Sequence, residues 1–169
     1  MKFRHYVAGL MISTTVVLAQ AAKPTVVMNE FTAINDSGLR DEEGDFSDWV
    51  ELHNFGTEPV DLTDAALTDN RKRLTKWTLP EITLEPGQYL VLFMSGKDRR
   101  TSDEPLHASF ALRGKSDYLG LIAVDGKTVI DEIAPKYPNQ KKDISYGISV
   151  SYTHLRAHET SLHLVCRLL

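Results

Sequence analysis

Residues 45–54 read Asp-Phe-Ser-Asp-Trp-Val-Glu-Leu-His-Asn, and we expect the fold to be built around this stretch. Val50 and Leu52 alternate with a glutamate and a histidine, the period-two pattern of a β-strand with one buried and one solvated face. Trp49 supplies the largest apolar surface near the start of the strand. The sequence therefore predicts a sheet that contains this strand, with Trp49, Val50 and Leu52 in the core.

Short apolar runs separated by turn residues follow, and no long helical stripe competes with them. The most continuous run, residues 89–94, is expected as a central strand with Tyr89, Val91 and Phe93 in the core. Asp125-Gly126, between two further runs, is a strong signal for a tight hairpin turn. Roughly eight to ten short strands at this spacing predict an all-β fold, an antiparallel β-sandwich.

The first 22 residues differ in composition from those that follow. Residues 1–22 have a basic start, a mostly apolar run and a small-x-small site at residues 19–21, which is the pattern of a secretory signal peptide. The apolar run is too short and too interrupted for a transmembrane helix, which needs about 20 apolar residues. We therefore expect an exported protein without a transmembrane span, placed outside the cell, on its surface or in the periplasm.

The last residues, 148–169, are rich in His and Leu and nearly free of acid. Residues 150–159 resemble the translation of a transposase adapter used in sequencing libraries. We interpret this tail as non-native, so that the natural protein would continue beyond Gly147 into further domains. The same interpretation accounts for His154 and His158, whose spacing would otherwise suit a zinc site on a helix.

Residues 23–147, the expected sandwich domain, contain 15 Lys and Arg against 22 Asp and Glu, a net charge of −7. This acidic balance argues against nucleic acid as a partner, because non-specific affinity for nucleic acid comes mainly from phosphate neutralisation. We expect the basic groups at 71–73, 97–100 and 141–142 to be solvated loops rather than one phosphate-binding patch. Cys166 is the only cysteine, so disulfides do not hold the domain.

Acidic residues gather just before the Trp49 strand. Asp41, Glu43, Asp45 and Asp48 are candidate calcium ligands, because calcium prefers several oxygen ligands on a flexible loop. Their spacing is not that of an EF-hand. The alternative is a solvated loop in which Asp45 or Asp48 orders its own turn through hydrogen bonds to the backbone. We favour this alternative and expect no other cofactor.

No group of residues supplies a nucleophile together with its base, so we predict no catalytic residue. His53 and His107 are isolated in the sequence, and we expect them on a polar face or in a loop. Trp49 and Trp77 could stack on sugar rings if they were exposed. Trp77 is opposite in phase to its two polar neighbours, however, so we expect both tryptophans in the core.

Several motifs together resemble the bacterial branch of the lamin-tail domain (LTD) family. They are Val27-Met-Asn-Glu-Phe31, residues 45–54, Leu67-Thr-Asp69, Lys76-Trp77, Leu84-Glu-Pro-Gly-Gln-Tyr-Leu-Val-Leu92 and Ser95-Gly-Lys97. The resemblance implies an immunoglobulin-like β-sandwich that serves as a non-catalytic module. It also implies export and covalent linkage to other domains, such as CotH-like kinase domains or nucleases.

We therefore expect an exported interaction, adhesion or spacer module at the front of a larger cell-surface or secreted protein, with a protein or a cell-surface glycan as its partner. One alternative is an accessory domain of an enzyme whose kinase-like or nuclease domain lies downstream. A second alternative is a calcium-supported carbohydrate-binding module.

Overall fold

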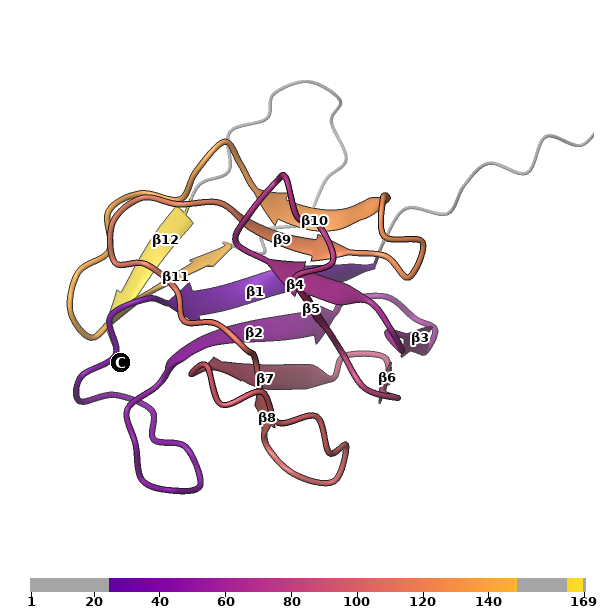
Figure 1. The fold of residues 1–169 in the computed structure, drawn as a ribbon, viewed down its shortest axis with the longest axis horizontal. Coiled ribbons are helices and arrows are strands. Elements are labelled where there is room, and N and C mark those ends of the chain that lie inside the picture. Colours follow the sequence, from indigo (N-terminus) through magenta and orange to yellow (C-terminus); the bar gives the residue numbers. More distant parts are fainter. Residues whose placement is uncertain (1–24, 149–163, 169) are drawn as a thin grey trace, which may run out of the picture.

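The computed structural model describes residues 25–148 and 164–168, and in this part of the chain every regular element is a β-strand (Figure 1). The strands are β1 (Val26–Thr32), β2 (Asp48–Asn54), β3 (Val60–Asp61), β4 (Ala66–Thr68), β5 (Trp77–Thr78), β6 (Thr83–Leu84), β7 (Tyr89–Met94), β8 (Leu106–His107), β9 (Leu119–Ile122), β10 (Val129–Ile133), β11 (Ile144–Ile148) and β12 (Leu164–Leu168).

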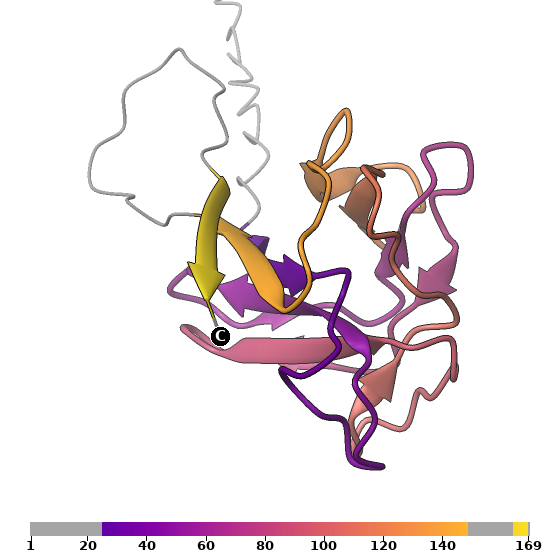
Figure 2. The same cartoon turned by 90° about the vertical axis from the view of Figure 1, so that its left-hand side faces the viewer.

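Two large sheets form the two layers of the fold, as Figure 2 shows from the side. One sheet has six strands in the order β12-β11-β1-β2-β7-β8, and the other has four in the order β10-β9-β4-β5. The short strands β3 and β6 make a separate two-stranded sheet. All pairs are antiparallel except β7 with β8. The predicted all-β antiparallel sandwich is confirmed.

Strand β2, the stretch from which the fold was predicted, lies inside the larger sheet between β1 and β7. Val50 and Leu52 are fully buried and belong to the cluster that fills the space between the layers. Opposite them on β7 stand Leu92 and Leu90, so the inward faces of the two strands match. Burial of these aliphatic side chains stabilises the fold by roughly 1.5–3 kcal/mol each.

Strand β1 contains an irregularity in its pairing with β2, which changes the residues that face the core. Met28 pairs with Leu52 and Glu30 pairs with Glu51, so Asn29 is an extra residue in the ladder, a β-bulge. The bulge shifts the alternation by one residue, and Met28 and Phe31 therefore both face the core. The Asn29 side chain donates to Glu51 Oε1 at 2.6 Å, which anchors the bulge.

The second sheet brings Leu67, Trp77, Leu119 and Leu121 into the same core. Its β9–β10 hairpin turns at Asp125-Gly126, where Gly126 has a φ of 68°. The segment after β10 adds a core residue that the sequence pattern did not indicate. Tyr137 is fully buried with its ring centroid 5.1 Å from that of Phe31, and its hydroxyl donates to the Arg113 carbonyl at 2.9 Å.

The prediction for β7 had the wrong phase. Tyr89 is 52% exposed and Val91 is only half-buried, whereas Leu92 and Met94 point into the core. Phe93 is buried, but on the face of the sheet that points away from the second layer, and the same holds for its partner Trp49 on β2. Residues 89–94 are apolar on both faces, so their sequence alone does not show which face points into the core. Pairing with β2 determines that face.

The expected signal peptide, residues 1–22, lies outside the described residues, and so does most of the expected tail. Of residues 148–169, the structure describes Ile148 at the end of β11 and the strand β12. Strand β12 pairs antiparallel with β11 in the register Ile144↔Leu168 to Ile148↔Leu164 (Figure 2).

Candidate functional site

The acidic loop between β1 and β2 is organised by Asp41. Its carboxylate is 0% exposed and accepts the backbone N–H of Glu43 at 3.1 Å, the N–H of Asp45 at 2.9 Å and the Ser47 hydroxyl at 3.2 Å. Burial by itself raises the pKa of Asp41, but hydrogen bonds from Lys97, the Asp45 backbone and Ser47 outweigh it and hold the pKa at about 2. The loop does order itself through an aspartate, but the residue is Asp41.

Lys97, from the loop after β7, holds the acidic loop from outside. Its ammonium lies 2.6 Å from an Asp41 oxygen, 2.7 Å from Glu43 and 3.0 Å from Asp45. The hydrogen bonds to Asp41 and Glu43 raise the pKa of Lys97, so the ammonium stays charged. Three of the four candidate calcium ligands therefore converge, but they converge on an ammonium group of the protein.

The fourth candidate, Asp48, is separate from this group. Its carboxylate accepts the backbone N–H of Asn35 at 3.4 Å and is also hydrogen-bonded by the backbone of Leu112. Burial is the largest influence and raises the pKa of Asp48 to about 6, against these hydrogen bonds. The four residues do not form one cation site.

His107, expected on a polar face or in a loop, is fully buried on β8, so that expectation is wrong. Its ring stacks on Phe93 with centroids 5.1 Å apart. Nδ1 lies 2.8 Å from Ser95 Oγ, and Nε2 lies 3.0 Å from both carboxylate oxygens of Glu42. Ser95, His107 and Glu42 thus form a hydrogen-bonded row. Sequence reasoning missed this row because Glu42 and His107 are 65 residues apart.

A serine, a histidine and a glutamate in a row are also the parts of a hydrolase triad. Here the His107 ring is fully buried and has no exposed surface from which to serve a substrate. Ser95 Oγ additionally accepts the backbone N–H of Lys97 at 3.2 Å. The row therefore ties the acidic loop to β7 and β8, and it does not form a catalytic centre.

Ligand atoms of Asp41, Glu42 and His107 lie within 4.8 Å of one another, which is close enough for a metal ion. The same carboxylates already bind cationic side chains of the protein, however. Lys97 binds Asp41, and Arg99 donates to Glu42 at 2.6 Å. The positive charge that these carboxylates need is supplied by the chain itself.

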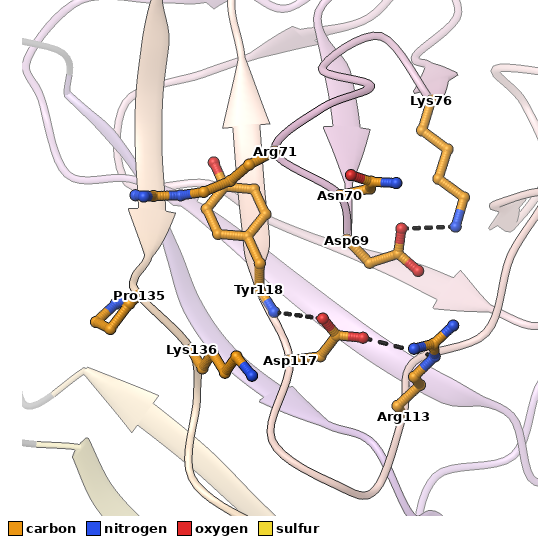
Figure 3. Close-up of a pocket in the computed structure, with 9 residues that line it drawn as sticks. All are labelled: Asp69, Asn70, Arg71, Lys76, Arg113, Asp117, Tyr118, Pro135 and Lys136. Atoms are coloured by element: carbon orange, nitrogen blue, oxygen red, sulfur yellow. Dashed lines mark hydrogen bonds and ion pairs between the residues drawn. The ribbon is translucent and has the colours of Figure 1, made fainter.

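A cleft of about 330 Å³ lies at one end of the four-stranded sheet (Figure 3). Its residues come from the loop between β4 and β5, the loop before β9 and the segment after β10. The lining residues are Asp69, Asn70, Arg71, Lys76, Arg113, Asp117, Tyr118, Pro135 and Lys136. Because neighbouring strands are antiparallel, these loops all meet at the same end of the sheet.

Four cations and two carboxylates line this cleft. Lys76 lies 2.6 Å from Asp69 Oδ1, and the Arg113 guanidinium lies 3.6 Å from Asp117 Oδ2 (Figure 3). Arg71 reaches out of the cleft to Glu132 at 2.9 Å. The cleft is thus a positively charged region on an acidic domain. Of its four cationic residues, only Arg71 belongs to one of the basic groups seen in the sequence.

Comparison with known protein families identifies the family of this chain. The family description Lamin Tail Domain matches residues 19–136. The chain belongs to the lamin tail domain family. A search of curated proteins found no match.

Membership makes this a lamin tail domain with an immunoglobulin-like fold, which is a non-enzymatic, interaction-type module. In the part of the chain that the structure describes, no helix is long and apolar enough to cross a membrane.

Both tryptophans of the lamin tail domain are buried. Trp77 is 1% exposed, lies in the core cluster and donates its indole N–H to Asp98 Oδ1 at 2.9 Å. Trp49 is 4% exposed on the outward face of the larger sheet. Neither ring offers a free face to a sugar.

The three basic groups of the sequence each bind their own acidic partners. Arg71 binds Glu132, Lys97 and Arg99 bind the acidic loop, and Lys142 lies 2.9 Å from Asp36. These ion pairs neutralise much of the charge that a phosphate backbone would need.

Proposed function

We propose that this lamin tail domain is an exported interaction module, used as an adhesion or spacer domain within a larger cell-surface or secreted protein. The observation that carries the proposal is the charged cleft at the loop end of the four-stranded sheet. Loop ends of immunoglobulin-like sandwiches are places where binding surfaces are built on a rigid scaffold. The acidic loop, by contrast, is occupied by Lys97 and Arg99 and serves the scaffold.

Export is supported by the composition of residues 1–22 and by the lack of any cysteine in residues 23–147. A domain without thiols folds in an oxidising compartment without the risk of wrong disulfides. An accessory role beside a kinase-like or nuclease domain is compatible with the same module, and sequencing of the gene beyond the codon for Gly147 would test it.

The calcium-supported carbohydrate-binding alternative has less support. Lys97 Nζ lies within 3.0 Å of the three carboxylates that would bind the ion. The tryptophans that would stack on a sugar are buried.

A fusion of the chain to alkaline phosphatase, which folds only after export, tests the proposal. The full chain fused to this reporter should give phosphatase activity outside the cytoplasm, and the product should run at the size expected after loss of about 20 residues. The control carries Val16→Arg and Val17→Arg, which interrupt the apolar run. Equal activity of the two fusions, or activity from neither, would contradict export.

The interaction part is tested separately with the purified full chain on an array of bacterial surface glycans and envelope proteins. Saturable binding to at least one class, reduced by changes in the cleft, is expected. A chain that binds nothing on the array would favour the spacer role over the adhesion role.

A further inference from the structure

The cleft gathers positive charge on a domain that is negative overall. Arg71 and Lys76 come from the β4–β5 loop, Arg113 from the loop before β9, and Lys136 from the segment after β10. Residues 23–147 carry a net charge of −7, so this is a local reversal of sign. A concave site with reversed charge concentrates counter-ions of one sign at that place.

Two of the four cations are already committed. Arg71 binds Glu132 at 2.9 Å and lies 5.0 Å from the centroid of the Tyr118 ring. Lys76 binds Asp69 at 2.6 Å and lies 4.1 Å from the centroid of the Phe110 ring. These two side chains shape the wall of the cleft.

The other two cations are available. Arg113 is 77% exposed at its side chain, and its one ion pair among the described residues, with Asp117, is long at 3.6 Å. Lys136 is exposed and forms no ion pair among residues 25–148. Figure 3 shows the two on opposite sides of Asp117. Asp117 itself accepts the backbone N–H of Tyr118 at 2.8 Å, so part of its charge is already satisfied.

The lining also indicates what kind of ligand fits. The aromatic residue of the lining, Tyr118, is buried and has the Arg71 guanidinium over its ring, so it does not present a free face for stacking on a sugar. What the cleft offers instead is the N–H donors of Arg113 and Lys136. Guanidinium and ammonium groups bind phosphate, sulfate and carboxylate through short, charge-assisted hydrogen bonds.

We propose that this cleft is an oxyanion site, in which Arg113 and Lys136 bind a phosphate, sulfate or carboxylate group carried by an acidic surface polymer. The proposal rests on the interaction role given above and names the chemistry of its partner. The volume of about 330 Å³ suits one such group together with part of the unit that carries it.

Calorimetric titration of the purified full chain with inorganic phosphate, sulfate and glucuronate, at constant ionic strength, tests the site. At least one probe should bind saturably, and the tightest of the three identifies the group. Arg113→Ser with Lys136→Ser should weaken that binding at least about tenfold, because two charge-assisted contacts are lost. Lys127→Ser with Lys141→Ser is the matched control: it removes the same charge from exposed positions outside the cleft and should change the affinity less than about twofold.

Absence of saturable binding by all three probes would overturn the proposal, as would equal losses in the two double variants. Urea denaturation of each variant shows that it is folded, and a variant with normal stability but no binding supports the site. Failure here leaves the phosphatase fusion unaffected, so the oxyanion site and the export proposal can fail independently.

Discussion

Replacing Lys97 by methionine is the most informative single change to the scaffold. The ammonium lies within 3.0 Å of three carboxylates, and the one at 2.6 Å, Asp41, has no exposed surface. Lys97→Met keeps most of the unbranched apolar stem and removes the ammonium group, with its charge and its hydrogen bonds to Asp41, Glu43 and Asp45. Asp41 would keep its hydrogen bonds from Ser47 and from the backbone but would lose its strongest counter-charge.

The size of the effect follows from the pKa of Asp41, which is lowered from 3.8 to about 2. At about 1.4 kcal/mol per pKa unit, the fold favours the ionised Asp41 by roughly 2 kcal/mol. Backbone and serine donors supply part of this, and Lys97 is itself partly solvated, so we expect Lys97→Met to lower the free energy of unfolding by about 1–2 kcal/mol.

Urea denaturation followed by tryptophan fluorescence measures the loss, with Lys72→Met as control, because Lys72 is exposed and forms no ion pair in the described part of the chain. A depressed carboxyl pKa contributes stability above about pH 4 that is lost as the pH falls toward 2. The difference between wild type and Lys97→Met should therefore shrink over that interval. A loss no larger than that of Lys72→Met, or one that is unchanged at pH 2.5, would refute the role of Lys97.

Three further predictions address Asp48, calcium and the tryptophans. Because burial raises the pKa of Asp48 to about 6, its ionisation destabilises the fold as the pH rises from about 4 through 6. In urea denaturation, Asp48→Asn should therefore raise the free energy of unfolding by about 1–2 kcal/mol at pH 7.5, after discounting for partial solvation, and by almost nothing at pH 4. An equal gain at both pH values would show that ionisation is not the cause. Calcium at 5 mM should leave the melting temperature of the wild type unchanged, because Lys97 occupies the carboxylates, and a clear upward shift would reopen the calcium interpretation. Iodide should quench the fluorescence of Trp49 and Trp77 weakly in the folded chain and strongly in urea, whereas strong quenching before denaturation would contradict their burial.

The oxyanion site and the acidic loop have one structural property in common. Both depend on contacts between loops that follow different strands, so truncation at either end of a loop would change several contacts together. Point substitutions at Lys97, Arg113 or Lys136 separate the contributions, because these side chains are partly or largely exposed and do not belong to the core cluster.

Local patterns in the sequence were sufficient for the elements whose evidence is local. The alternation around Val50 and Leu52 predicted β2 and its inward face, and Asp125-Gly126 predicted the β9–β10 hairpin. These features depend on neighbours within a few residues, where the period of the chain and the turn preferences act directly. Turn residues between short runs were likewise enough to predict an all-β sandwich.

The sequence alone did not determine features that depend on residues far apart in the chain. Tyr89 was placed in the core because residues 89–94 are apolar on both faces, and only pairing with β2 selects the face. Lys97 meets Asp41 across 56 residues, and His107 meets Glu42 across 65. The cleft joins three loops that no pattern connects. Periodicity shows which residues of a segment face solvent and which face the core. Which charged side chains of separate loops come together is decided by strand order and register, and these exist only once the sheets are assembled.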